Sequence, residues 1–161
     1  MDQADVVSVT SRWQVRRAAE ADVGAWAELR AALWPEDDAA SHAVELRRVL
    51  AQPCGTIGFL AIDADGRACG FAEAALRRDY VNGTGSSPVG FLEGWYVVPE
   101  ARGRGAGRAL VAAVEQWTRE QGCAELASDV LLDNQPGHRA HVACGFEETE
   151  RVVYFRKHLS G

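Results

Sequence analysis

A glycine-rich turn between an apolar strand and an amphipathic helix restricts the fold of this 161-residue chain more than any other feature. The turn lies within Val97–Arg108 and contains Gly103, Gly105 and Gly107. Apolar residues then recur at helical spacing through residues 107–120. Such a turn presents backbone N–H groups at the start of a helix, where they bind an anion such as a diphosphate. The alternative is a plain flexible turn with solvated arginines.

Short apolar runs alternate with helical patterns along the rest of the chain. Strands are expected at residues 13–17, 56–62, 68–76, 89–98, 125–131 and 151–158, and helices at 22–33, 41–52, 107–120 and 136–145. This order mixes hairpins with strand–helix–strand crossovers, so the pattern predicts an α/β fold with a mixed sheet and flanking helices. Residues 1–12 are expected to form a loose arm ahead of a single domain at 13–161.

The charge balance and the cysteines exclude several classes of protein. Seventeen basic and 23 acidic residues give a net charge of −6, which argues against nucleic-acid binding and suits a cationic substrate. No apolar run approaches the ~20 residues of a membrane span, and the acidic start does not resemble a signal peptide. The four cysteines show neither C-x-x-C nor zinc spacing, so we expect reduced thiols, no metal and a cytoplasmic location.

The spacing Arg102-x-x-Gly105-x-Gly107 resembles the signature of the GNAT superfamily of acetyl-CoA-dependent N-acetyltransferases. A dinucleotide site would need its glycines earlier in the chain, and a P-loop would need a Gly-Lys-Ser/Thr ending. The family places this turn after a long strand and follows it with a further strand and a short helix ending in Gly-Phe, here Gly145-Phe146. The resemblance covers residues 15–157 and implies the GNAT fold, in which the strands at 89–98 and 125–131 splay apart.

The resemblance also implies that acetyl-CoA, as co-substrate, lies between these two strands. Backbone groups of Tyr96, Val97 and Val98 would bind the acetyl group and the pantetheine, with the Val97 N–H polarising the thioester carbonyl. The turn would hold the diphosphate through Arg104, Gly105, Ala106, Gly107 and Arg108.

Two further positions carry implied roles with alternatives. Asn134 would bind the pantetheine, or would instead cap the helix that begins near Pro136. His141 stands where many family members have a tyrosine that protonates the leaving thiolate, so the general acid stays open.

Several scattered segments resemble the aminoglycoside 6′-N-acetyltransferases, in the right order along the chain. They include Leu33-Trp34-Pro35, Asp79–Thr84, Phe91–Gly94, Ser128-Asp129 and Glu148–Phe155. This resemblance implies acetyl transfer to the 6′-amine of an aminoglycoside antibiotic by direct attack in a ternary complex, giving antibiotic resistance. The alternatives are a GNAT enzyme that acts on a protein N-terminus or a polyamine, and a non-catalytic acyl-CoA-binding module. Relatives are often dimers, so a homodimer is expected.

Isolated carboxylates mark the two strands that would flank the thioester. Glu93 and Asp129 each lie in an apolar strand, where an unpaired buried charge is costly, so each needs a protein arginine or a substrate ammonium as partner. We expect Asp129 to be the general base, with Glu93 as the alternative, and both to contact substrate. Glu73, in another strand, is expected to be structural.

Three more residues are expected at the substrate. Trp34 and Tyr80 would form flat walls against the sugar rings, because each lies in a loop rich in proline or glycine. Glu150 is a weaker candidate for binding an ammonium group.

Overall fold

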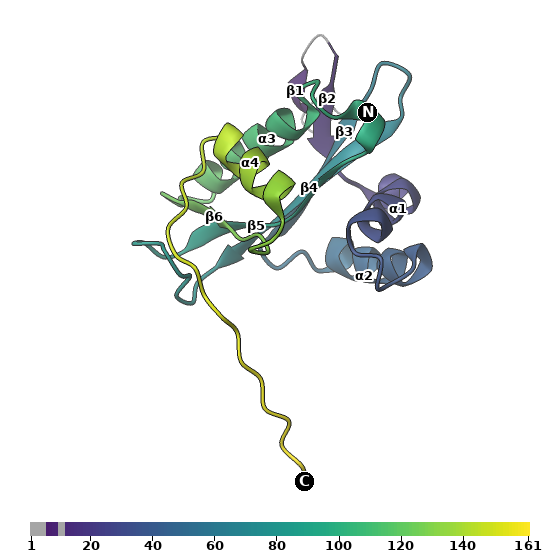
Figure 1. The fold of residues 1–161 in the computed structure, drawn as a ribbon. Coiled ribbons are helices and arrows are strands. Elements are labelled where there is room, and N and C mark those ends of the chain that lie inside the picture. Colours follow the sequence, from purple (N-terminus) through teal and green to yellow (C-terminus); the bar gives the residue numbers. More distant parts are fainter. Residues whose placement is uncertain (1–5, 10–11) are drawn as a thin grey trace. The chain divides into compact units, whose positions relative to one another are not determined.

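The computed structural model describes residues 6–9 and 12–161. The strands are β1 (Val6–Val9), β2 (Gln14–Arg17), β3 (Thr56–Ile62), β4 (Ala68–Arg77), β5 (Val89–Val97) and β6 (Leu126–Ser128). The helices are α1 (Val23–Leu33), α2 (Ala39–Ala51), α3 (Ala106–Glu120) and α4 (Gln135–Ala143), with short 3-10 turns η2 (Glu20–Asp22) and η3 (Pro99–Ala101) (Figure 1). Contacts divide the chain into two compact units, residues 1–129 and 130–161.

The first unit contains a six-stranded sheet in the order β1 to β6. Neighbouring strands are antiparallel except β5 and β6, which are parallel, so the predicted mixed sheet is confirmed. Helix α3 lies on one face of the sheet, and α1 and α2 lie on the other (Figure 1).

The parallel pair β5–β6 separates part-way along β5. Leu92 pairs with Ser128 as the last matched residues of β5 and β6, and β5 continues to Val97 beside β4. The predicted splay of these two strands is therefore confirmed, although β6 ends at Ser128, earlier than the expected residue 131. We call the point just beyond Leu92 and Ser128 the fork.

A bulge in β5 lies directly at the fork. Glu73 of β4 is opposite Gly94 and Ala74 is opposite Leu92, which leaves Glu93 as the extra residue. A bulge re-aims the side chain that it carries, and Glu93 is the exposed residue in a stretch of β5 that is otherwise buried from Val89 to Gly94.

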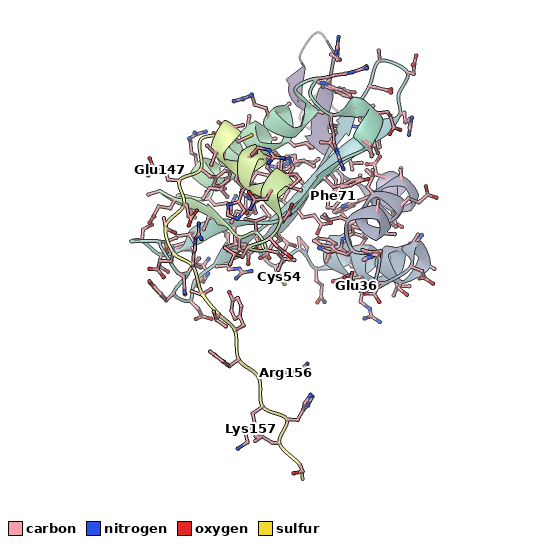
Figure 2. The ribbon with its side chains drawn as sticks, in the orientation of Figure 1. Glu36, Cys54, Phe71, Glu147, Arg156 and Lys157 are labelled. Atoms are coloured by element: carbon pink, nitrogen blue, oxygen red, sulfur yellow. The ribbon has the colours of Figure 1, made fainter. Side chains whose placement is uncertain are left out.

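Both faces of the sheet are covered by apolar helix faces. Helix α3 buries Leu110, Val111, Val114 and Trp117, as the spacing predicts. On the other face, a cluster centred on Trp26 and fully buried Phe71 joins α1, α2 and the sheet; Figure 2 labels Phe71 there. Each such side chain contributes about 1.5–3 kcal/mol by burial, so these two layers hold the fork in place.

Two local predictions need correction at the N-terminal side. Residues 6–9 form β1 against β2, so the expected loose arm is wrong for them; β-branched valines favour a strand, and β2 supplies the partner. Residues 1–5 and 10–11 of that arm lie outside the described residues. Helix α2 begins at Ala39, ahead of the expected residue 41, because the Asp38 carboxylate accepts the Ser41 N–H at 2.8 Å and caps the helix there.

The second unit contains α4 and an extended C-terminal segment (Figure 1). The predicted strand at 151–158 is wrong, since the described residues after α4 form neither helix nor strand. Figure 2 labels Arg156 and Lys157 on this segment, and the neighbouring Tyr154 and Phe155 are 85% and 93% exposed. Valine and aromatic residues in this run favour a strand, but a strand needs a hydrogen-bonding neighbour as well.

Within the part of the chain that the structure describes, no helix is both long and apolar enough to cross a membrane.

Candidate active site at the fork

Two carboxylates flank the fork, one on each strand. Glu93 and Asp129 are the residues that follow the last matched pair, Leu92 and Ser128. The predicted neighbourhood of Glu93 and Asp129 thus follows from the parallel register. Their expected burial is wrong: Asp129 is exposed beyond the end of β6, and the bulge turns Glu93 outward to 34% exposure.

Glu93 already has a protein partner. The Arg77 guanidinium donates from Nε and Nη2 to Oε1 at 3.1 and 2.9 Å, and from Nη2 to Oε2 at 2.8 Å. The same guanidinium carbon lies 3.7 Å from the centroid of the Phe91 ring. A protein arginine and a substrate ammonium were the two partners expected for Glu93, and in the structure the partner is the protein arginine.

Beyond the fork, the backbone N–H and C=O groups of successive β5 residues point alternately to the two sides of the strand. The Val98 N–H donates to the Cys69 carbonyl at 2.9 Å, and the Val98 carbonyl accepts from Ala101 at 3.0 Å. The Val98 N–H is therefore taken by β4, while its carbonyl oxygen keeps a second lone pair that a ligand could use. Successive N–H groups of a strand point to opposite sides, so the N–H of Tyr96 faces β4 and that of Val97 faces away, toward the open side of the fork.

Arg102, part of the glycine signature, holds the end of β5. Its Nε donates to the Val97 carbonyl at 2.8 Å, and its guanidinium lies 5.5 Å from the centre of the Tyr96 ring. This role of Arg102 is not among those that the sequence predicts, although Arg102 is the first residue of the Arg-x-x-Gly-x-Gly signature. These contacts fix the Val97 carbonyl. They thereby help to orient Val97, whose N–H faces the fork.

The first turn of α3 is an open donor site for an anion. Gly105 adopts φ +92°, a left-handed conformation that favours glycine, and its carbonyl accepts the Ala109 N–H at 3.0 Å. That bond is the first of the helical ladder, so the N–H groups of residues 106–108 have no partner within the helix. They carry the partial positive charge of the helix N-terminus, and the exposed Arg104 and Arg108 add full charges.

Gly107 joins this turn to the fork. A Cβ at Gly107 would lie 3.2 Å from the Trp95 indole, so the first turn of α3 packs directly against β5, two residues before Val97. The absence of a side chain at Gly107 therefore allows this close packing, because a Cβ there would crowd Trp95. The Arg104 carbonyl accepts from the Trp13 indole at 2.9 Å and ties the turn to the chain ahead of β2.

Most of the chain matches one known protein family. The sequence model described as the acetyltransferase (GNAT) family matches residues 23–146. The chain belongs to the GNAT family. Its splayed strands, its Arg-x-x-Gly-x-Gly turn and its helix N-terminus are the parts that the resemblance implied.

Close relatives have a common name. An aminoglycoside N(6′)-acetyltransferase type 1 of Stenotrophomonas maltophilia is 58% identical over 151 residues, covering 94% of this chain and 97% of that protein. The crystal structure of the aminoglycoside 6′-N-acetyltransferase AAC(6′)-Ih of Acinetobacter baumannii has a TM-score of 0.86 at 42% identity, covering 92% of this chain and 99% of that one. AAC(6′)-Iy in complex with the bisubstrate analogue CoA-S-monomethyl-acetylneamine has the same TM-score and identity, covering 92% and 100%.

Trp34 of this GNAT protein lies beside the bulge. It is half-buried, its ring meets Phe71 edge-on at 6.0 Å, and a Cβ at Gly94 would come within 2.5 Å of its indole. The Arg30 guanidinium lies 5.1 Å from its ring centre. Trp34 thus packs against the residue next to Glu93, which agrees with a wall at the fork.

The arginine that contacts Trp34 belongs to a buried ion pair. Arg30, 7% exposed, contacts Glu73 at 2.7 and 3.0 Å and Glu45 at 2.7 Å, and Glu73 also accepts from the Trp26 indole at 2.8 Å. Burial raises the pKa of Glu73, while Arg30 and Trp26 oppose that rise. The predicted structural role of Glu73 is consistent with these contacts.

The remaining predicted residues are outside this group of contacts. Tyr80 is 74% exposed in the loop after β4, and Glu150 is exposed in the second unit. Asn134 caps α4 by accepting the Gly137 N–H at 3.0 Å, the alternative that the sequence left open. His141 Nδ1 lies 2.7 Å from the Gly137 carbonyl, so Nδ1 carries the proton in the neutral ring and only the imidazolium can donate from Nε2. Among the described residues, no three metal-ligating side chains gather.

Proposed function

We propose that this protein is an aminoglycoside 6′-N-acetyltransferase that uses acetyl-CoA and thereby confers antibiotic resistance. The observation that carries the proposal is the fork: two carboxylates flank the end of the β5–β6 ladder, and further along β5 an outward-facing backbone N–H lies near the open N-terminus of α3. The relatives at up to 58% identity, named for this activity, support the same substrate. The net charge of −6 suits a polycationic substrate.

The chain offers a donor for each charged part of the co-substrate. Acetyl-CoA supplies the acetyl group as a thioester and carries a diphosphate. The first turn of α3, residues 104–108, would hold the diphosphate through backbone N–H groups and the two arginines. The Val97 N–H would donate to the thioester carbonyl oxygen, whose negative charge grows as the amine attacks.

The acids would bind and deprotonate the amine. An aminoglycoside amine is mostly protonated near neutral pH, so a base must accept a proton, directly or through water, before attack. Asp129 is our proposed base, because it is exposed at the fork, whereas the oxygens of Glu93 accept from Arg77. Glu93 would contact another ammonium group of the substrate.

The remaining contacts with substrate and pantetheine are proposed from the family resemblance. Trp34 would bind a sugar ring, and its place beside Gly94 supports this. Tyr80 and Glu150 would bind substrate, and Asn134 would bind the pantetheine in addition to its cap. The matched family region, residues 23–146, includes parts of both units, which supports one catalytic domain over 13–161.

The wild-type protein should acetylate kanamycin and tobramycin with acetyl-CoA. An analogue with a 6′-hydroxyl in place of the 6′-amine should release no thiol above background, because the nucleophile is missing from the position held at the fork. Release of free CoA and the mass spectrum of the product measure both. Acetylation of that analogue at a comparable rate would show that another amine is used.

Arg108→Glu should weaken acetyl-CoA binding about 10- to 100-fold, since it replaces attraction by repulsion beside a diphosphate. Folding should survive, because the side chain is exposed and a carboxylate suits a helix N-terminus. Arg48→Glu makes the same charge change on an exposed site of α2 and is the matched control. Calorimetric titration with CoA decides; equal affinities in the two variants would remove the turn from the cofactor site.

We also propose a cytoplasmic homodimer. The four cysteines are not joined in disulfides, as expected in a reducing compartment. The C-terminal run Val153-Tyr154-Phe155 is 77–93% exposed, and exposed apolar runs are typical of interaction sites. Sedimentation should give twice the mass of one chain and fractionation should place the protein in the cytoplasm; a monomer at micromolar concentration would contradict the dimer.

A further inference from the structure

We infer that Arg77 is a competing cation: it occupies the seat that Glu93 and Phe91 provide for an ammonium group, and a cationic substrate must displace it. This inference rests on the proposed function. It assigns to Arg77 a part in selecting the substrate, one that neither the sequence pattern nor the relatives' names indicate.

The seat has the chemistry of a cation site on two sides. The Phe91 ring presents its negative face to the Arg77 guanidinium at 3.7 Å, and Glu93 supplies the counter-charge at 2.8–3.1 Å. An ammonium group can make the same two contacts. The seat adjoins the fork, since Phe91 pairs with Ala127 and Glu93 follows the last pair of the parallel ladder.

The Arg77 side chain is free to move away from Glu93 and Phe91. Arg77 is the last residue of β4, its side chain is 43% exposed, and Glu93 is 34% exposed. Half-exposed ion pairs of this kind contribute little net stability, because water solvates both groups after separation. Rotation of a long exposed side chain is fast and requires no change of the strand.

Removing the competing cation should therefore strengthen substrate binding. Arg77→Gln should lower the KM for kanamycin about two- to fivefold, with kcat unchanged within about twofold. Arg77→Lys, which keeps the charge, should leave the KM close to the wild-type value. The gain should shrink at high salt, since it depends on exposed charges.

Two controls separate displacement from other effects of the change. Arg78→Gln removes the same charge one residue away, in the loop after β4, without the Glu93 contact, and should change the KM less. In a Glu93→Gln background, Arg77→Gln should no longer lower the KM, because the contested carboxylate is absent. Melting temperatures of all variants show whether any of them is merely less stable.

A rise in KM for Arg77→Gln would overturn the proposal, because Arg77 would then orient Glu93 for the substrate. An equal effect of Arg78→Gln, or a gain that persists without Glu93, would overturn it as well. The proposed function fails separately, if the wild-type protein acetylates no aminoglycoside. In that case calorimetric binding of kanamycin to the same variants gives the answer: tighter binding to Arg77→Gln than to wild type and Arg78→Gln supports the competing cation, and no difference rejects it.

Discussion

Replacing Asp129 by asparagine is expected to lower kcat/KM for kanamycin by about 10²–10⁴-fold, the usual contribution of a positioned acid–base group. Asparagine keeps the shape of the side chain and removes its ability to accept a proton. Acetyl-CoA affinity should hardly change, because the groups proposed to hold the co-substrate are the Val97 backbone and the first turn of α3. Steady-state kinetics and a CoA titration on the same preparation measure the two quantities.

Glu93→Gln is the companion to this variant. It should mainly raise the KM, by an amount that falls at high salt, because Glu93 is proposed to bind an ammonium group rather than to take the proton. Asp129 is exposed, so its change should leave the melting temperature near the wild-type value. Full activity of Asp129→Asn would end its candidacy as the base and transfer the role to Glu93 or to a water molecule.

Arg30→Met should lower the free energy of unfolding by about 3–5 kcal/mol. Methionine keeps the apolar stem of the side chain, but it leaves the Glu73 carboxylate buried without its arginine, with the Trp26 indole still donating to it. Urea unfolding at neutral pH measures the loss. Trp34 would lose the guanidinium stacked on it, so the KM for kanamycin should rise as well.

The cause of that loss can be tested in two ways. The double variant Arg30→Met/Glu73→Met should recover most of the stability, since apolar pairs often replace buried ion pairs without penalty.

Lowering the pH should also stabilise the Arg30→Met variant. Burial already raises the pKa of Glu73 above its value of about 4.5 in the unfolded chain, and loss of Arg30 removes an opposing effect. The folded state then binds this proton more tightly, so the contribution of Glu73 to stability is greatest below pH 4.5 and is lost as the pH rises through the folded-state pKa. A loss under about 1 kcal/mol for Arg30→Met would contradict this account.

The local sequence was sufficient for several parts of the site. The helical spacing of residues 107–120 predicts α3, and the glycines ahead of it predict its open N-terminus. These features depend on neighbours within a few residues, since capping, turn conformation and helix amphipathicity are short-range. The family resemblance added the splay of the strands, which the register of β5 and β6 confirms.

Only the tertiary structure decided which groups are available at the fork. The bulge that exposes Glu93, the Arg77 guanidinium on it and the bond that occupies the Val98 N–H all depend on pairing between β4 and β5. Strand pairing also decided that residues 6–9 form a strand beside β2, while residues 151–158, which likewise contain valine and aromatic residues, do not. Backbone hydrogen bonds of a strand require a second strand as partner, and a one-residue bulge reverses the side to which a side chain points, so neither outcome can be read from the composition of the strand itself.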